Sequence, residues 1–440
     1  MKSRKNSMRK RTEIKTLFSY VSSVSLFVVS ALLFAGCVTV KSKTNDASDV
    51  KNQTSGASSR PDLVLIIIDS LRSDHMGCYG YARNTTPGID AFAKEAAQFN
   101  QAVSSSSWTQ PSVMSIFSSV EPATHLRADW DKPHNTNIIT VAETLRNAGY
   151  QTIGITANGM THRRFGYAQG FDLYDDFTAA LSPEASPASN ASQPPSGAIL
   201  TRFATDWLLN KRDPSKPLFL FVMYMDPHWD YIPPTPYDTM FAENDPVPAL
   251  RGISTLGNTQ LTDIAKRRII NAYDGEIAFT DRHVSELLAA IKSSASGNRT
   301  AIAICSDHGE AFWERGTTVA HGNNLYDEEI RVPLIVKTPG NNTGRIIKQQ
   351  VGTIDIGPTF LGFAGIPVPE SWQGTDLAPL LRGDEMPEKP VTSDLRIFNN
   401  FITAVRTSEK KTIFLTAEPD KPIEIYDLKA DPGETVNLSR

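Results

Sequence analysis

The sequence has 440 residues, of which 40% are hydrophobic and 21% are charged, so it can bury one large core or two modest ones. Its formal net charge is −4 at pH 7. A negative net charge disfavours binding of a polyanion, so nucleic-acid binding is not expected.

Residues 1–36 have the layout of a secretory signal. Seven Lys or Arg and one Glu are followed by an apolar stretch that closes on "FAGC". This ending resembles a bacterial lipoprotein signal, which implies Cys37 as the lipidated first residue of the mature chain. Loss of this segment leaves a net charge of −10. We therefore expect an envelope protein, lipid-anchored at the periplasmic face or in the outer membrane of a bacterium. The alternative is an uncleaved spanning helix, since the apolar run approaches the ~20 residues that cross a bilayer.

The next segment, residues 37–60, is small and polar and nearly free of aromatic residues. Such a composition cannot bury enough apolar surface to offset the entropy of ordering, so it predicts a flexible tether. The remaining cysteines, Cys78 and Cys305, lie far apart in the sequence. We expect two buried free thiols rather than a disulfide.

Short apolar runs rich in β-branched residues predict buried strands, and helical stretches separate them. The runs are "PDLVLIIID", "QTIGITA", "PLFLFVMYM", "TAIAICSD" and "VPLIVKT", and the clearest helices are "NTNIITVAETLRNAG" and "YDGEIAFTDRHVSELLAAIKSS". Alternation of strands with helices predicts a doubly wound α/β fold with a parallel sheet. Reactive groups in such folds gather at the carboxyl ends of strands, where Asp69, Asp226 and Asp307 stand.

After about Gly374 the chain changes to shorter pieces of alternating, strand-like pattern, such as "ITAVRTSEKKTIFLT" and "IEIYDLKADPGETVNL". They predict a small C-terminal α+β layer on the main sheet. We therefore expect a catalytic domain over residues 61–375 and a small subdomain over residues 376–440.

In "ICSDHGEAFWERG", Asp307 and His308 follow an apolar strand and precede a glycine. A carboxylate and an imidazole at a strand end can turn into one pocket, and glycine permits close backbone approach. Taken alone, such a pair is more often structural than a metal site.

Further segments change that interpretation. They are "IIIDSLRSDHMGCYGYARNTTPGIDAFA", "SSWTQPSVMSIFSS", "MYMDPHWDYIPP", "HGNNLYDEEIRVPLIVKTPG", "TIDIGPTFLGFAGIPVP" and "YDLKADPGETVNL". In this order and at these intervals they resemble the sulfatase family of the alkaline phosphatase superfamily. The resemblance extends from about Pro61 to the C-terminus, and it implies an alkaline phosphatase-like sheet.

The resemblance also implies one divalent metal ion at the end of the sheet. Asp69 matches the family's first metal-binding acid, and Asp307 and His308 match its second metal-binding pair. Ser70 stands where many sulfatases have a second Asp. Fewer carboxylates and a nitrogen donor favour Mn²⁺, Zn²⁺ or Mg²⁺ over Ca²⁺, although the identity stays open.

The nucleophile turn departs from the family. Sulfatases carry Cys or Ser in a C/S-x-P-x-R turn, and oxidation of that residue produces formylglycine. Here Thr109 takes the reacting place, and Val113 replaces the Arg. Thr has a methyl group on Cβ, so the same oxidation cannot yield the aldehyde. A Thr there resembles the phosphoryl-transferring branch of the superfamily, which implies Thr109 as nucleophile and as a fourth metal ligand.

The resemblance implies two catalytic histidines, His228 in "DPHWDYIPP" and His321 in "HGNNLY", that contact the ester or act as acids. Asn158 is a weaker match to a polar pocket position. Asp226 is expected near the metal ligands without binding the ion. Arg72 is expected to be structural, pairing with Asp74 or a carbonyl group.

The sequence therefore predicts a membrane-anchored, metal-dependent hydrolase that cleaves phosphate mono- or diesters, or sulfate esters, through Thr109. The substrate would be a small, glycan-linked or lipid-linked anionic ester. The alternatives are a formylglycine-independent sulfatase and an anion-binding lipoprotein without turnover. Transferase activity is less expected, because family transferases usually carry several spanning helices ahead of the catalytic domain.

Overall fold

The computed structural model describes residues 60–125, 131–135, 137–176, 196–242, 261–316, 319–397 and 400–439. The predicted signal, the anchor residue Cys37 and the tether up to residue 59 lie outside the described residues. Among the helices described, none has the length and apolarity that a membrane span requires. Cys78 and Cys305 are free thiols, as predicted, although Cys78 is only half-buried.

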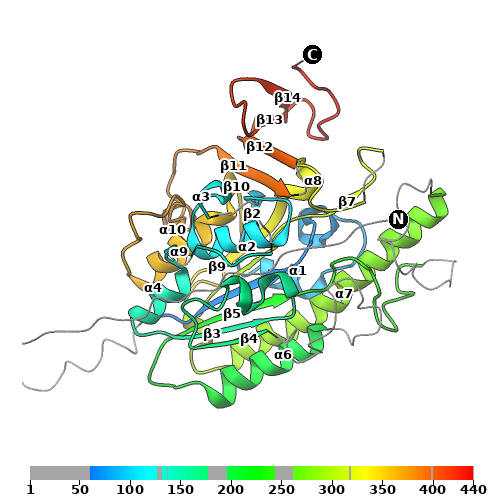
Figure 1. Cartoon of the computed structure of the whole chain (residues 1–440). Helices are drawn as coiled ribbons and strands as arrows, with labels where there is room; N and C mark the ends of the chain where they lie inside the picture. The colour runs from blue at the N-terminus through cyan, green and yellow to red at the C-terminus, as the bar shows by residue number, and fades with distance from the viewer. Residues whose placement is uncertain are drawn as a thin grey trace, which may run out of the picture. The chain divides into compact units, whose positions relative to one another are not determined.

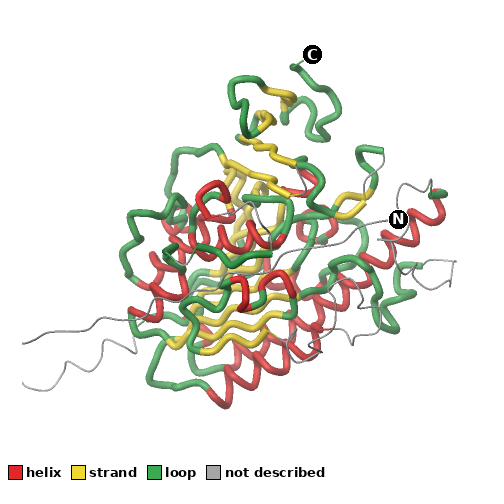
Figure 2. The backbone as a smooth tube through the Cα atoms, viewed as in Figure 1, coloured by secondary structure: helices red, strands yellow, loops and turns green. Residues whose placement is uncertain are grey.

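The core of the fold is an eight-stranded sheet with strand order β10-β2-β9-β6-β1-β5-β3-β4 (Figures 1 and 2). Its strands are β1 (Leu63–Ile68), β2 (Ala97–Val103), β3 (Gln151–Thr156), β4 (Leu173–Asp176), β5 (Leu218–Tyr224), β6 (Ala301–Cys305), β9 (Arg331–Lys337) and β10 (Arg345–Gly352). All five predicted apolar runs are strands of this sheet.

The sheet is mixed rather than parallel. Strand β9 runs antiparallel to both of its neighbours, β6 and β2, whereas the other pairs are parallel. A continuous apolar run reports that a strand is buried on both faces, but it carries no information on direction. The expectation of a wholly parallel sheet was therefore wrong at β9.

Helices cover both faces of the sheet, which confirms the doubly wound fold (Figure 1). The helices are α1 (Pro87–Ala93), α2 (Thr109–Ser118), α3 (Pro122–His125), α4 (Val141–Asn147), α6 (Ser196–Asp206), α7 (Asp263–Ser293), α8 (Asp327–Ile330), α9 (Ile356–Ala364) and α10 (Ala378–Arg382). Alternate residues of β1 point to opposite faces: Leu65 packs with the side of α2, α4 and α9, and Ile66 with that of α1, α6 and α7.

Helix α7 begins ten residues before the predicted start at Tyr273. Its N-cap is Thr262, whose side chain accepts a hydrogen bond from the Ala265 N–H. The added turns are rich in charged residues and mostly outside the core, so the apolar pattern did not reveal them. A threonine at the N-cap stabilises a helix that begins at this position, because its side chain accepts a hydrogen bond from an N–H group that the first turn leaves unpaired.

The C-terminal layer is a four-stranded antiparallel sheet of β11 (Val391–Ile397), β12 (Asn400–Arg406), β13 (Lys410–Leu415) and β14 (Pro422–Asp427). A two-stranded ribbon of β7 (Ala311–Phe312) and β8 (Val319–Ala320) is separate from it. The small C-terminal layer is therefore confirmed, while the exact boundary at residue 375 stays a prediction. Trp108 packs in the core of this layer with Leu395 and Ala404, so the layer supports the turn that carries Thr109.

A buried ion cluster ties this layer to α8. The Lys411 ammonium group is fully buried and lies 2.5 Å from Asp327 and 2.7 Å from Glu434. Arg406 adds a second ion pair to Asp327, at 2.8 Å. Burial of Lys411 is tolerated because two carboxylates and the Leu325 carbonyl group surround its nitrogen.

We expect Lys411→Met to lower the free energy of unfolding by about 3–5 kcal/mol, because Glu434 and Asp327 would lose the buried cation that lies between them and only Asp327 would keep its ion pair with Arg406. Chemical denaturation followed by circular dichroism measures the change. The matched control is Lys410→Met, since Lys410 is the neighbouring residue of β13 and is exposed; it is expected to leave stability nearly unchanged. Equal losses in both variants would contradict the role of the cluster.

Candidate active site

The carboxyl ends of β1 and β6 bring the predicted metal ligands together. The register pairs Ile67 with Cys305, so Asp69 and Asp307 each lie two residues beyond the same position of adjacent parallel strands. Ligand atoms of Asp69, Asp307 and His308 all lie within 4.8 Å of one another, and the three side chains are fully buried. The Asp69 N–H also donates to the Tyr224 carbonyl group, 3.0 Å away, at the end of β5.

Ser70, which replaces a second acid, holds both carboxylates. Its hydroxyl group donates to Asp69 Oδ1 at 2.9 Å, and its N–H donates to Asp307 Oδ1 at 3.2 Å. Its φ of 56° lies in the left-handed region, which is uncommon for a residue with a side chain. The Tyr273 hydroxyl group fixes this conformation by donating to the Ser70 carbonyl group at 2.7 Å.

The donor set fits a divalent cation. His308 Nδ1 lies 2.9 Å from the Gly309 carbonyl group, so this nitrogen carries the proton and Nε2 faces the acids. His308 Nε2 is 3.4 Å from Asp307 Oδ2 and 3.6 Å from Asp69 Oδ1. Asp307 Oδ2 is buried and has no hydrogen-bond partner among the described residues. Burial, with Asp307 nearby, raises the pKa of Asp69, as expected for two acids gathered in one buried site.

Asn158, expected only weakly, lies in this site. It follows β3, and its side-chain amide donates to Asp69 Oδ2. Its carbonyl oxygen accepts a hydrogen bond from the Met160 N–H at 2.6 Å, which sets the orientation of the amide group. Asn158 and Ser70 therefore hold the two oxygens of Asp69.

Thr109 is the first residue of α2 and is 2% exposed. Its hydroxyl oxygen lies 3.3 Å from His308 Nε2, which places it beside the two acids. The N–H groups of a first helical turn have no partner within the helix and carry a partial positive charge, which favours negative charge at this point. Val113, one turn further, lies in the hydrophobic core. The position that holds Arg in the usual turn is therefore occupied by a core side chain.

The predicted catalytic histidines lie next to His308. The ring centroid of His321 is 4.2 Å from that of His308 and 4.9 Å from that of His228. Burial lowers the pKa of His228, and burial together with His308 lowers that of His321.

Arg72 and Asp226, which were predicted near the site, contact groups other than the metal ligands. Arg72 donates to Asp74 and, at 2.9 Å, to the Glu310 carbonyl group, which confirms its structural role. Asp226 accepts a hydrogen bond from the Gly197 N–H at 3.2 Å and does not belong to the metal-ligating triad.

Sequence reasoning missed Glu310 and Tyr273. Glu310 is fully buried, and burial raises its pKa to about 7. The available signal for Glu310 was its place in "SDHGE", two residues after His308 on the same strand-end segment. Tyr273 lies within a long helix, where no pattern marks it.

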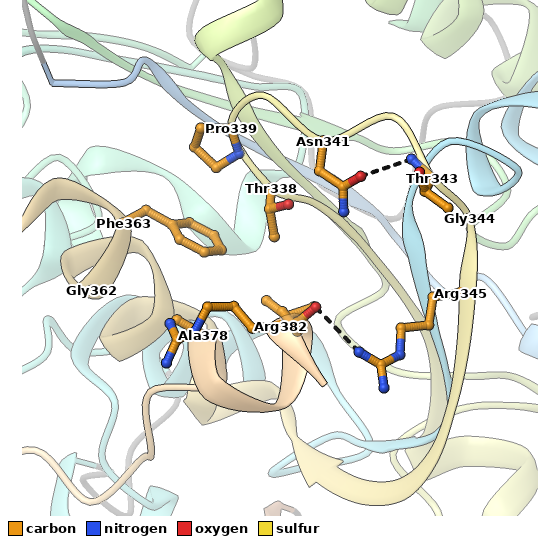
Figure 3. Close-up of a pocket in the computed structure, with 11 residues that line it drawn as sticks. Thr338, Pro339, Asn341, Thr343, Gly344, Arg345, Gly362, Phe363, Ala378 and Arg382 are labelled. Atoms are coloured by element: carbon orange, nitrogen blue, oxygen red, sulfur yellow. Dashed lines mark hydrogen bonds between the residues drawn. The ribbon is translucent and has the colours of Figure 1, made fainter. Parts of the chain in front are cut away.

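A surface pocket of about 560 Å³ lies elsewhere (Figure 3). Thr338 and Arg345 line it, and the ring of Phe363 points into it. Thr338 follows the antiparallel strand β9 and Arg345 begins β10, so the pocket lies at the edge of the sheet opposite to Asp69 and Asp307. It therefore plays no part in the site built on the carboxyl ends of β1 and β6.

Comparisons with known proteins identify the family of the chain. The family model "Sulfatase" matches residues 61–366, and "N-sulphoglucosamine sulphohydrolase, C-terminal" matches residues 322–440. A Delta 4,5-hexuronate-2-O-sulfatase of Bacteroides thetaiotaomicron is 26% identical, over 87% of this chain and 85% of the relative. An arylsulfatase of Clostridium perfringens is 24% identical, over 86% of this chain and 90% of the relative.

Two solved structures share the fold. A protein in complex with its substrate D-glucosamine-2-N,6-O-disulfate has a TM-score of 0.72 at 22% identity and covers 86% of this chain and 93% of its own. A phosphonate monoester hydrolase of Agrobacterium radiobacter has a TM-score of 0.72 at 20% identity, over 86% and 92%. The chain therefore belongs to the sulfatase family of the alkaline phosphatase superfamily, and it is a hydrolase of sulfuric or phosphoric esters.

Proposed function

We propose that this enzyme hydrolyses phosphate mono- or diesters with Thr109 as the nucleophile and a divalent metal ion as cofactor. The observation that carries the proposal is the Thr109 hydroxyl group, 3.3 Å from His308 Nε2 at the N-terminus of α2. The methyl group on its Cβ prevents conversion to formylglycine. A formylglycine diol expels sulfate by reverting to the aldehyde, whereas an ester of Thr needs a second attack, and this difference favours phosphorus over sulfur.

Asp69, Asp307 and His308 would hold the metal ion, with the Thr109 oxygen as a fourth ligand. When bound, a divalent cation polarises ester oxygens and lowers the pKa of a neighbouring hydroxyl group. The cation would also neutralise two carboxylates that are otherwise buried side by side.

The reaction would proceed in two displacements. The Thr109 hydroxyl group gives its proton to water, its oxygen attacks phosphorus, and the bond from phosphorus to the leaving alcohol breaks. The leaving oxygen takes a proton from His228. In the second displacement water attacks the phospho-Thr, passes a proton to the same histidine, and Thr109 leaves and regains a proton. The products are the alcohol and a phosphate or phosphate monoester.

Hydrolysis of sulfate esters is the second candidate. It is favoured by the relatives, which include the hexuronate sulfatase and the arylsulfatase. It would require Thr109, or another group, to support sulfuryl transfer without formylglycine. A third candidate, anion binding without turnover, is favoured by the missing Arg at Val113 and the missing acid at Ser70. A small, glycan-linked or lipid-linked anionic ester fits each of the three.

Steady-state turnover distinguishes the candidates. The purified chain would be stripped of metal, supplied with Mn²⁺, Ca²⁺, Zn²⁺ or Mg²⁺, and assayed on aryl sulfate, aryl phosphate and aryl phosphodiester substrates with the same leaving group. We expect kcat/KM for a phosphoester to exceed that for the sulfate by orders of magnitude. Preferred sulfate turnover would overturn the assignment to phosphorus, and absence of turnover on all three would support the anion-binding candidate.

A further inference from the structure

Glu310 is a buried carboxylate at the edge of the proposed site. It lies between β6 and β7 and is 0% exposed. Its Oε1 lies 3.1 Å from His321 Nδ1, and the Tyr231 hydroxyl group is a second polar neighbour of the carboxylate. Full burial of a carboxylate lowers stability, and buried ionisable groups of this kind concentrate at functional sites.

The backbone around His321 is held independently of Glu310. Glu329 accepts a hydrogen bond from the Asn323 N–H at 3.2 Å. The Gly322 N–H donates to the Ser107 carbonyl group at 2.9 Å, which ties this segment to the turn that carries Thr109. With the main chain fixed in this way, the orientation of the His321 ring remains to be set, and the Glu310 carboxylate contacts Nδ1 of that ring.

The contact also determines which nitrogen faces the ester. An imidazole that donates from Nδ1 to a carboxylate is held in the tautomer with an unprotonated Nε2. Nε2 lies on the side of the ring away from Glu310. The same ring packs against that of His308 with the ring centroids 4.2 Å apart, and His308 Nε2 lies 3.3 Å from the Thr109 hydroxyl oxygen.

We propose that Glu310 is a positioning residue that orients His321 and presents its Nε2 to the ester at Thr109. This role rests on the proposed function. Glu310 does not itself touch the reacting atoms, and it acts through the ring of His321. A merely structural Glu310 would support the fold without controlling the ring of His321.

The kinetic test compares Glu310→Leu, Glu310→Gln, His321→Ala and the double variant Glu310→Leu/His321→Ala on the preferred aryl ester. Glu310→Leu is expected to lower kcat by about 10–100-fold with KM nearly unchanged. Glu310→Gln is expected to retain most of kcat, because its amide oxygen still accepts the Nδ1–H. The double variant is expected to fall no further than His321→Ala, since the two residues act as one unit. Additive losses would overturn the proposal.

A second measurement does not depend on turnover. Nitrogen-15 NMR of histidine-labelled protein, with His321 assigned by the His321→Ala variant, reports which ring nitrogen is protonated. We expect the Nδ1–H tautomer in the wild type and its loss in Glu310→Leu; an unchanged tautomer would overturn the proposal. If the wild type hydrolyses no ester, the proposed function fails while this result still decides the role of Glu310.

Asp281→Asn is the matched control. Asp281 is also a buried carboxylate, but it accepts hydrogen bonds from the Gly88 and Ile89 N–H groups at the start of α1. This variant is expected to lower thermal stability while leaving both kcat and the His321 tautomer unchanged. A change in the tautomer here would show that any loss of a buried carboxylate disturbs the ring, and it would overturn the specific role of Glu310.

Discussion

Thr109→Ala is expected to lower kcat for the preferred ester by about 10³-fold or more, because it removes the oxygen that attacks the ester. The substitution deletes a hydroxyl and a methyl group from a residue that is 2% exposed, and it keeps the first turn of α2. KM is expected to change much less, since the remaining groups of the site still bind the anion. Steady-state kinetics of the wild type and the variant give both values.

The control is Thr109→Ser, which restores the hydroxyl group at the same place and is expected to recover a large part of kcat. Acid quenching during turnover, followed by peptide mass spectrometry, is expected to find a phosphoryl group on Thr109 in the wild type. Residual turnover of Thr109→Ala close to that of the wild type would show that another group attacks the ester, and the assignment of the nucleophile would be wrong.

Removal of the metal ion is expected to abolish turnover, and Asp307→Ala is expected to weaken metal affinity by at least about 100-fold. Asp307 is fully buried, and its Oδ2 is oriented toward His308 without another partner among the described residues. Calorimetric titration of the metal-stripped protein with Mn²⁺ or Zn²⁺ measures the affinity directly. Thermal unfolding gives an independent measure, because an ion at 100 times its dissociation constant stabilises the fold by about 2.7 kcal/mol.

The matched control for this prediction is Asp62→Asn. Asp62 is a buried acid that precedes β1, the strand adjacent to the one that Asp307 follows, and it pairs with Arg212 at the opposite edge of the sheet. Its substitution is expected to lower stability and to leave metal affinity unchanged. If metal raised the unfolding temperature of Asp307→Ala as much as that of the wild type, Asp307 would not be a ligand.

The strand ends show how far sequence patterns lead to a site. Continuous apolar runs predicted β1 and β6, and the polar residue that ends each run marks the point where the strand leaves the core. Since adjacent parallel strands end at the same edge, Asp69, Asp307 and His308 could be expected together. Thr109 was assigned instead from the resemblance of its turn to the nucleophile turn of sulfatases, and the methyl group on its Cβ is part of its covalent structure.

By itself, then, the sequence determined the fold class and the residue types that carry the chemistry, because apolar periodicity and covalent structure are local properties, and the resemblance of its motifs indicated the family. Only the tertiary structure decided the antiparallel direction of β9, the placement of Val113 in the core and the contact between Glu310 and His321. These depend on which segments pack against one another. An apolar stretch of sequence indicates burial, whereas the direction of a strand and the partner of a buried carboxylate are set by long-range packing.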